Sequence, residues 1–232
     1  MKILALDTSS RAGSAALLDD DRLVAAHQLD VSATHSERLL PAVDRLLGDA
    51  GWKIADLALL ACAKGPGSFT GLRIGIASAK GMAVAASLPL VGVDSLEATA
   101  LALAFAAAPI AALIDARKRQ VYAALFQPDG RGGLRRLRDD VSTPAAPWAA
   151  EIAGPCLFVG DGAELYWDEI RAAKPDAALA PLTLCCPRAA SVGWLGRRAF
   201  LAGEKGLIAH YVRPSDAELN PKFAPGVEAA TK

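Results

Sequence analysis

The sequence predicts an α/β protein made of two similar lobes, each with a mixed sheet flanked by helices. Three observations predict this fold class. A strand–turn–strand pattern at the amino terminus recurs near the middle of the chain. After each copy, helical segments alternate with short apolar strands. The 232 residues, 53% hydrophobic and 22% charged, suffice for one large core or two smaller ones.

The repeated unit is an apolar strand that ends in aspartate, a polar turn and a second apolar strand. The stretch LALDTSSRAGSAALLDDD, from Leu4, aligns without a gap with ALIDARKRQVYAALFQPD, from Ala112. This alignment places Asp7 on Asp115, and both copies end in a hairpin turn. We therefore expect a duplicated fold in which each lobe begins with three strands. The third strands are expected at residues 22–29 and 134–137.

The later elements follow from periodicity and from turn residues. Pro41 is expected to kink the first helix or to lie in its first turn, and Thr34 and Glu37 can form a capping box before it. Helices are expected at about residues 35–49, 69–86, 146–152, 163–173 and 188–202, and strands at 57–63, 89–93 and 156–160.

These elements predict a division of the chain into parts. The predicted parts are an N-terminal lobe (1–104), a C-terminal lobe (105–187), a segment (188–215) that packs back on the first lobe, and a disordered tail (216–232).

A glycine-rich loop, ACAKGPGSFTGLRIG (61–75), joins an apolar strand to a helix. A Walker loop would need a Gly-Lys pair, and the dinucleotide pattern fails because its third glycine comes one position late, at Gly71. Phosphate binding by backbone amides at the helix start stays open as an alternative. The favoured interpretation is structural: Gly-Pro-Gly forms a turn, and Ser68 or Thr70 caps the helix.

The helix after this loop carries small residues four positions apart. Each interior glycine costs about 0.5–1 kcal/mol relative to alanine, so a close contact should offset the loss. The preceding helix adds an apolar stripe, and this stripe could cover the chain's own sheet, serve a partner, or do both. The predicted partner-interface residues are Leu39, Leu40, Val43, Leu47, Gly71, Leu72, Gly75, Ile76, Ala79 and Met82.

The duplicated layout resembles the actin, hexokinase and acetate kinase superfamily, which has the actin-like ATPase (ribonuclease H-like) fold. That resemblance implies that the two aspartate-bearing hairpins face a nucleotide cleft. However, the first turn, TSSRAG, lacks the glycine pair with which kinases of this fold wrap phosphate. We expect a vestigial nucleotide cleft at Asp7, Thr8, Ser9 and Asp115. No cofactor is expected, apart from a nucleotide held weakly or at an interface with a partner.

Six blocks together resemble the TsaB family, also called YeaZ. They are ILALDTSS at the start, HSERLLP (35–41), GPGSFTGLRIGIASAKGMA (65–83), PLVGVDSLEA (89–98), DARKRQVYAA (115–124) and YVRP (211–214). They occur in order over nearly the whole chain, and GPGSFTGLRIG is highly specific. The resemblance implies a non-catalytic subunit in the synthesis of N6-threonylcarbamoyladenosine beside the anticodon of tRNA.

The resemblance also implies partners. TsaB proteins form a heterodimer with a paralogue, the transferase TsaD, and work with the ATPase TsaE. The family's dimers form through the first two helices of the amino-terminal lobe. A homodimer of the chain alone is left open, and contact with tRNA is expected to be indirect.

A comparison with the paralogue argues against catalysis. TsaD-like enzymes carry NHLEGH after the strand PLxGV, and its two histidines bind a metal. Here PLVGV is followed by DSLEAT, which puts Ser95 and Thr99 at the histidine positions. Hydroxyls are poor ligands for zinc or iron compared with imidazole. We therefore expect no metal and no catalytic residue; the alternative is an ATP-dependent kinase or transferase of the actin-like superfamily acting on its own.

Composition limits the remaining functions. The 25 basic and 25 acidic residues cancel, so strong direct binding of nucleic acid is not indicated, and basic runs at 117–119 and 131–138 are interpreted as solvated surface. The four cysteines form no CxxC pair, which is typical of a reducing cytoplasm. The apolar stretch 98–114 is too short for a membrane span and is broken by Pro109. We expect a cytoplasmic protein with no membrane contact.

Overall fold

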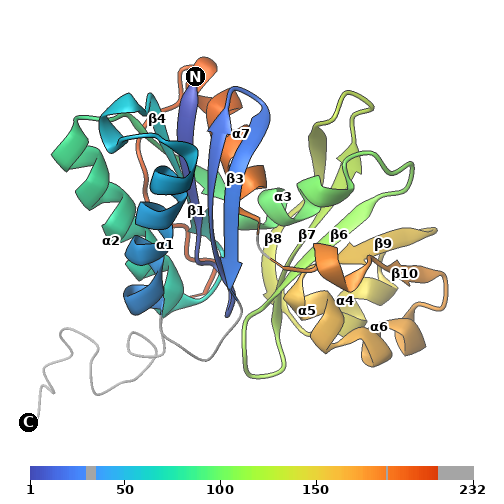
Figure 1. The fold of residues 1–232 in the computed structure, drawn as a ribbon. Helices are drawn as coiled ribbons and strands as arrows, with labels where there is room; N and C mark the ends of the chain where they lie inside the picture. Colours follow the sequence, from blue (N-terminus) through green and yellow to red (C-terminus); the bar gives the residue numbers. More distant parts are fainter. Residues whose placement is uncertain (30–34, 187, 214–232) are drawn as a thin grey trace, which may run out of the picture.

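The structure is a computed structural model that describes residues 1–29, 35–186 and 188–213. The chain forms two lobes, each built on a five-stranded mixed sheet (Figure 1). Both sheets carry helices on their faces, so the polypeptide has the layered α/β architecture that the sequence predicts.

The first lobe is covered by helices on both faces of its sheet. It contains the strands β1 (Lys2–Asp7), β2 (Gly13–Asp19), β3 (Arg22–Leu29), β4 (Leu59–Gly65) and β5 (Leu90–Asp94), in the order β3-β2-β1-β4-β5. The helices α1 (His35–Ala50) and α2 (Phe69–Ala86) cover one face, and α7 (Ala189–Leu201), from the far end of the chain, packs against the other.

The apolar character of β1 follows from this double cover. Because side chains alternate along a strand, Leu4 and Leu6 contact the core under α1 and α2, whereas Ile3 and Ala5 contact the core under α7. β1 pairs antiparallel with β2 and parallel with β4. A central strand that is buried on both faces therefore reads as one continuous apolar run.

The second lobe repeats this topology. It contains the strands β6 (Ile110–Asp115), β7 (Val121–Pro128), β8 (Leu134–Thr143), β9 (Cys156–Val159) and β10 (Ala177–Leu179), in the order β10-β9-β6-β7-β8. Its outer face is covered by α4 (Ala145–Ala150), α5 (Asp161–Leu165) and α6 (Trp167–Ala173). Read from β8 inward, the strands follow each other as they do from β3 inward in the first sheet. The duplicated two-lobed fold is thus confirmed.

A short helix, α3 (Ser95–Ala100), lies between the lobes (Figure 1). Ala98 belongs to the first lobe's core, under α7, while Leu96 and Ala100 belong to the core of the second lobe. Asp94 caps this helix by accepting a hydrogen bond from the Glu97 N–H at 2.8 Å. This single turn and a half of helix therefore contributes side chains to both hydrophobic cores.

The structure differs from the predicted elements in a few places. The helix predicted at 163–173 is two helices, α5 and α6, which meet at Tyr166. Pro41 is the seventh residue of α1, beyond its first turn, and the helix continues across it. α3 and β10 were not predicted, because six and three residues are too short to show periodicity. The capping box at Thr34 lies outside the described residues, as does the tail 216–232.

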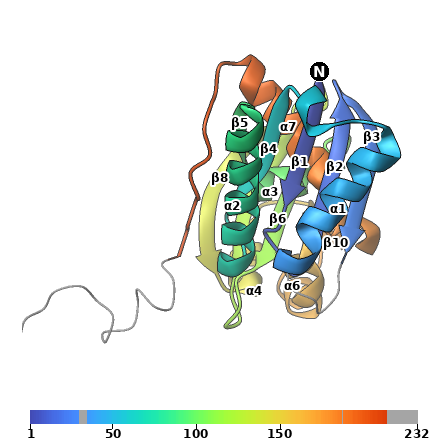
Figure 2. The same cartoon turned by 60° about the vertical axis from the view of Figure 1, so that its left-hand side comes forward.

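Residues 203–213, here called the C-terminal strap, run along the open edge of β5 (Figure 2). The Gly206 N–H donates to the Leu90 carbonyl at 2.8 Å, and the Gly206 carbonyl accepts from the Gly92 N–H at 3.0 Å. Further along, the His210 N–H donates to the Lys64 carbonyl at 2.7 Å. The strap thus brings its last described residues to the junction of the two lobes.

The apolar stretch 98–114 folds as the end of α3, a short 3₁₀ turn and β6. In the part of the chain that the structure describes, no helix has the length and apolarity needed to cross a membrane.

Candidate functional site

The glycine-rich loop packs against the turn between β1 and β2. The Ser68 N–H donates to the Ser9 carbonyl at 2.6 Å, and the Ser68 hydroxyl accepts from the Gly71 N–H at 3.2 Å, which caps α2. A Cβ atom at Gly67 would collide with Ser9. Glycine is therefore needed at position 67 so that the loop can touch this turn. The helix cap by Ser68, one of the two predicted capping residues, is present.

The small-residue stripe of α2 faces the end of β1 in the same chain. The Thr8 hydroxyl donates to the Gly71 carbonyl at 2.8 Å. A Cβ at Gly71 would collide with the Thr8 carbonyl, and one at Gly75 with the Thr8 hydroxyl. The close contact that offsets the helix glycines is thus between α2 and β1, and a partner helix is not needed to explain it. This corrects the physical basis of the predicted interface.

The predicted partner-interface residues differ in exposure. Leu40 is 50% exposed, and Leu47 and Met82 are partly buried. In this conformation a partner can contact Leu40 and other outward residues of the two helices, such as Val84, which is 81% exposed. The other seven predicted residues are buried within the first lobe: Leu39, Val43, Gly71, Leu72, Gly75, Ile76 and Ala79.

The two repeat aspartates do not share a cleft. Asp7 is buried under the β1–β2 turn, where the Ser9 N–H and hydroxyl donate to its Oδ1 at 2.9 and 2.7 Å. Thr8 and Ser9 are buried with it. Asp115 does line the cleft; its Oδ1 accepts from the Arg117 N–H at 2.9 Å, and its Oδ2 lies 3.4 Å from the Arg117 guanidinium. Of the four predicted cleft residues, only Asp115 is placed there.

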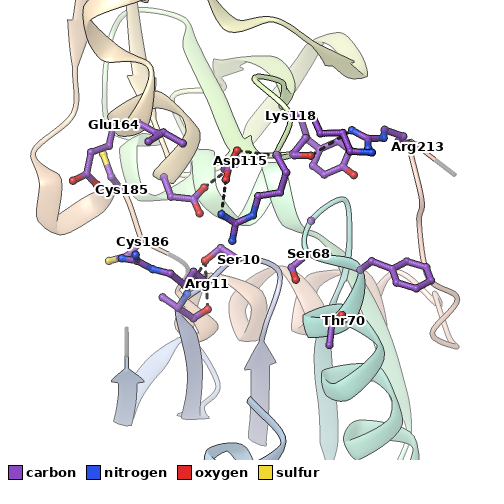
Figure 3. Close-up of a pocket in the computed structure, with 18 of the residues that line it drawn as sticks. Ser10, Arg11, Ser68, Thr70, Asp115, Lys118, Glu164, Cys185, Cys186 and Arg213 are labelled. Carbon is purple, nitrogen blue, oxygen red and sulfur yellow. Dashed lines mark hydrogen bonds and ion pairs between the residues drawn. The ribbon is translucent and has the colours of Figure 1, made fainter. Parts of the chain in front are cut away.

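A cleft of about 660 Å³ lies between the lobes (Figure 3). The β1–β2 turn and the start of α2 form one wall, and the end of β6 and α5 form the other. Cationic side chains enter it from three segments: Arg11 from the first turn, Arg117 and Lys118 from the β6–β7 turn, and Arg213 from the strap. Its carboxylates, Asp115, Asp161 and Glu164, all belong to the second lobe.

Burial shifts the pKa of Asp161, a carboxyl group of this cleft. Its Oδ1 accepts a hydrogen bond from the Asp115 N–H at 3.1 Å. Burial raises the pKa of Asp161 to about 6, and the neighbouring Asp115 charge adds to the increase. Two carboxyl groups close together on one wall favour a cation or a proton at this point of the cleft.

Ser95 and Thr99, which stand at the histidine positions of TsaD-like enzymes, have structural roles. The buried Ser95 hydroxyl accepts from the Gly65 N–H at 3.2 Å, and the Thr99 hydroxyl donates to the Ser95 carbonyl at 2.8 Å. The first of these bonds joins the glycine-rich loop to α3, and the second lies within α3. Within residues 1–29, 35–186 and 188–213, no group of three or more His, Cys, Asp or Glu side chains could hold a metal ion.

A polar cluster that sequence reasoning missed joins the two lobes and the strap. The Arg136 guanidinium lies 3.1 Å from Asp94 Oδ2 and also pairs with Asp140 on its own strand, β8. His210 Nε2 lies 3.1 Å from the other Asp140 oxygen. Burial, helped by the Asp94 charge, raises the pKa of Asp140 to about 6. The run of charged residues along 135–140 was the available signal, but it does not indicate which side chains they meet.

The fold and the site together define a class: a two-lobed α/β protein with duplicated mixed sheets, whose first hairpin turn is packed against a glycine-rich loop. A family model described as "TsaD: tRNA N6-adenosine threonylcarbamoyltransferase" matches residues 29–191. The tRNA threonylcarbamoyladenosine biosynthesis protein TsaB of Bacillus subtilis is 34% identical over 222 residues, which are 94% of this chain and 96% of that protein. The chain belongs to the TsaB (YeaZ) family.

Two further comparisons agree with this assignment. TsaB of Escherichia coli is 42% identical over 134 residues, 57% of this chain and 58% of that protein. The structure of YeaZ from Pseudomonas aeruginosa matches with a TM-score of 0.75 and 31% identity, and the match covers 90% of this chain and 99% of that one. The fold therefore agrees with that of a solved family member over nearly the whole length.

Proposed function

We propose that this chain is a non-catalytic subunit in the biosynthesis of N6-threonylcarbamoyladenosine in tRNA. The observation that carries the proposal is the match to Bacillus subtilis TsaB over 94% of the chain. The non-catalytic part is supported by Ser95 and Thr99, which are buried and hydrogen-bonded inside the fold. A hydroxyl that serves the protein's own backbone is a poor substitute for a metal-binding imidazole.

In this proposal the chain acts in the cytoplasm and forms a heterodimer with a TsaD-like transferase through the outer face of α1 and α2. The half-exposed Leu40 and the exposed Val84 supply apolar contacts on that face, and such contacts form the centre of protein interfaces. A TsaE-like ATPase works with the heterodimer, and the same face supports a homodimer when the transferase is absent.

Paired substitutions test the interface. Leu40 on α1 and Leu23 on β3 are both 50% exposed, so an arginine at either position should be tolerated by the fold. We expect Leu40→Arg to weaken association with the TsaD-like paralogue about tenfold or more, because it places a charge in the interface. Leu23→Arg should leave the association unchanged. Gel filtration and titration calorimetry of the mixed proteins measure both.

Two results would contradict the proposal. Equal affinity of the Leu40→Arg and Leu23→Arg variants for the paralogue would show that the α1–α2 face is not the interface. Failure of the unsubstituted chain to associate with the paralogue at micromolar concentration would show that the two proteins are not partners.

The alternative is an ATP-dependent kinase or transferase acting alone. The cleft with Asp115 and several cations favours it. Against it, Asp7 is buried beneath its turn and bonded to Ser9, so this carboxylate is not presented to a bound Mg²⁺–nucleotide. Calorimetry with ATP and an ATP-turnover assay on the purified chain decide the question, since turnover without any partner would replace the proposed function.

A further inference from the structure

One rim of the interlobe cleft carries a stack of aromatic and cationic side chains that the proposed interface does not use. The Arg73 guanidinium carbon lies 3.8 Å from the centre of the Phe69 ring. The centre of the Phe69 ring lies 5.3 Å from that of Tyr211, at an interplanar angle of 44°. Phe69 and Tyr211 both line the cleft, and Tyr211 is 43% exposed. The stack therefore ends in a tyrosine ring that is partly open to solvent.

The residue before this tyrosine is held from both lobes. The preceding residue, His210, is bonded to Lys64 of β4 through its N–H and contacts Asp140 of β8 through its ring. Phe69 is the first residue of α2, which Ser68 caps. A ring positioned by two lobes and a strap is pre-organised, so a ligand that stacks on it loses little entropy in ordering it.

Two cations, Lys118 and Arg213, lie beside the stack, and Asp115, which pairs with Arg117, lies between them and Glu164. In Figure 3, Lys118 and Arg213 lie on one side of the cleft, and Glu164 and Cys185 lie on the other. Arg213 Nη1 is 3.5 Å from the Ala116 carbonyl, so this side chain reaches from the strap to the second lobe. The balanced charge of the whole chain therefore does not prevent two cations from lying together at this rim.

We propose that this rim, formed by Phe69, Arg73, Lys118, Tyr211 and Arg213, contacts an unpaired segment of RNA. A base stacks on Tyr211, and backbone phosphates pair with Lys118 and Arg213. Aromatic platforms beside cations bind single strands in this way, because every base has a flat face and every nucleotide carries a phosphate. The inference rests on the proposed function, which supplies tRNA as the RNA, with its anticodon loop as the unpaired segment.

The position of the rim suits a subunit of a larger assembly. Phe69 and Arg73 lie on α2, the helix whose outer face is proposed to bind the transferase. RNA on the rim would therefore lie next to the partner. Few phosphate contacts and no net positive charge mean that the chain alone binds weakly. The rim adds a direct contact with tRNA, in place of the purely indirect contact that the sequence led us to expect.

Binding of a labelled anticodon stem-loop by the heterodimer with the TsaD-like paralogue tests this inference. Fluorescence anisotropy compares the stem-loop with a fully paired RNA of similar length. We expect Tyr211→Leu to weaken stem-loop binding about fivefold or more, with little effect on the paired RNA, and Tyr211→Phe to retain binding. The double variant Lys118→Ala/Arg213→Ala should lower the slope of log affinity against log salt by about 1.4, for two single-strand phosphate contacts.

The control is Arg131→Ala, which removes a charge from the exposed β7–β8 turn. Unchanged stem-loop affinity in Tyr211→Leu, or an equal loss for the paired RNA, would overturn the stacking contact. An unchanged salt slope in the double variant would overturn the phosphate contacts. Gel filtration first verifies the heterodimer for each variant. If the unsubstituted chain forms none, the proposed function fails on its own, and the same RNA measurements on the chain alone still decide the inference.

Discussion

At the scale of single residues, Asp161 shows how burial sets the charge of the cleft. Its carboxyl group is enclosed at the start of α5 and accepts a hydrogen bond from the Asp115 N–H. Enclosure disfavours the ionised form, which is why the pKa rises from the ordinary 3.8 to about 6. In the unfolded chain the group returns to its ordinary value, so folding is linked to proton uptake at this residue.

The sign of this linkage gives a prediction. Below about pH 4 the carboxyl group is protonated in both states; as the pH rises toward 6, only the folded state retains the proton, and ionisation destabilises the fold. Asp161→Asn stays neutral and keeps an oxygen to accept from Asp115. We therefore expect the unfolding free energy of this variant, relative to the unsubstituted protein, to increase from about pH 4 to about pH 7.

Urea unfolding at several pH values across this range measures the difference. Asp168→Asn, on the exposed surface of α6, is the matched control and should show no such trend. A difference that stays constant with pH would mean that Asp161 is not enclosed in the folded protein.

At the scale of elements, α2 serves two purposes with two faces. Its inner face carries Gly71 and Gly75 against Thr8, and its outer face carries Gly81, where an added Cβ would meet nothing within 4 Å. An arginine at position 75 would be driven into the end of β1. Such a variant would unfold the lobe, so it cannot separate partner binding from folding, and outward residues must be used for that purpose.

The two faces predict that a glycine-to-alanine substitution changes the unfolding free energy in opposite directions. Gly75→Ala places a methyl group on the Thr8 hydroxyl, and we expect it to lower the unfolding free energy by about 1–3 kcal/mol. Gly81→Ala, on the same helix with open space around it, should raise the unfolding free energy by about 0.5–1 kcal/mol, because alanine favours the helix. Chemical denaturation distinguishes them; a stabilising Gly75→Ala would contradict the close approach of α2 to β1.

At the scale of the whole molecule, the relative position of the lobes depends on Arg136. This side chain lies between Asp94 of the first lobe and Asp140 of the second, and its guanidinium lies 4.7 Å from the centre of the Phe126 ring. Without the guanidinium, two carboxylates would face each other at the junction. Like charges at short range in a partly buried place repel strongly.

We therefore expect Arg136→Met to lower the unfolding free energy by about 2 kcal/mol, through loss of its charged hydrogen bonds. The same change should increase the radius of gyration as the lobes separate. Arg135→Met, the exposed neighbour on β8, is the control. Denaturation and small-angle scattering check both variants, and an unchanged Arg136→Met would show that the other contacts, such as the packing of α3, suffice to hold the lobes.

Local patterns predicted most of the fold, and they were weakest where distant residues meet. The repeat around Asp7 and Asp115 predicted the duplicated sheets because the pattern of a strand and its turn lies in consecutive residues and can be recognised without knowing the fold. The glycine spacing of α2 predicted a close contact, but spacing alone does not say whether the neighbour is a partner helix or Thr8 of the same chain. The cluster around Arg136 depends on residues from three separate segments, so no local pattern reveals it.

The late position of α7 has a consequence for synthesis on the ribosome. One face of the first sheet, including Ile3 and Ala5, is covered by a helix whose first residue is Ala189. While the second lobe is being translated, α7 is still missing from that apolar face. The nascent polypeptide therefore exposes part of this apolar face until α7 has been made, which makes it a natural client for chaperones near the exit tunnel.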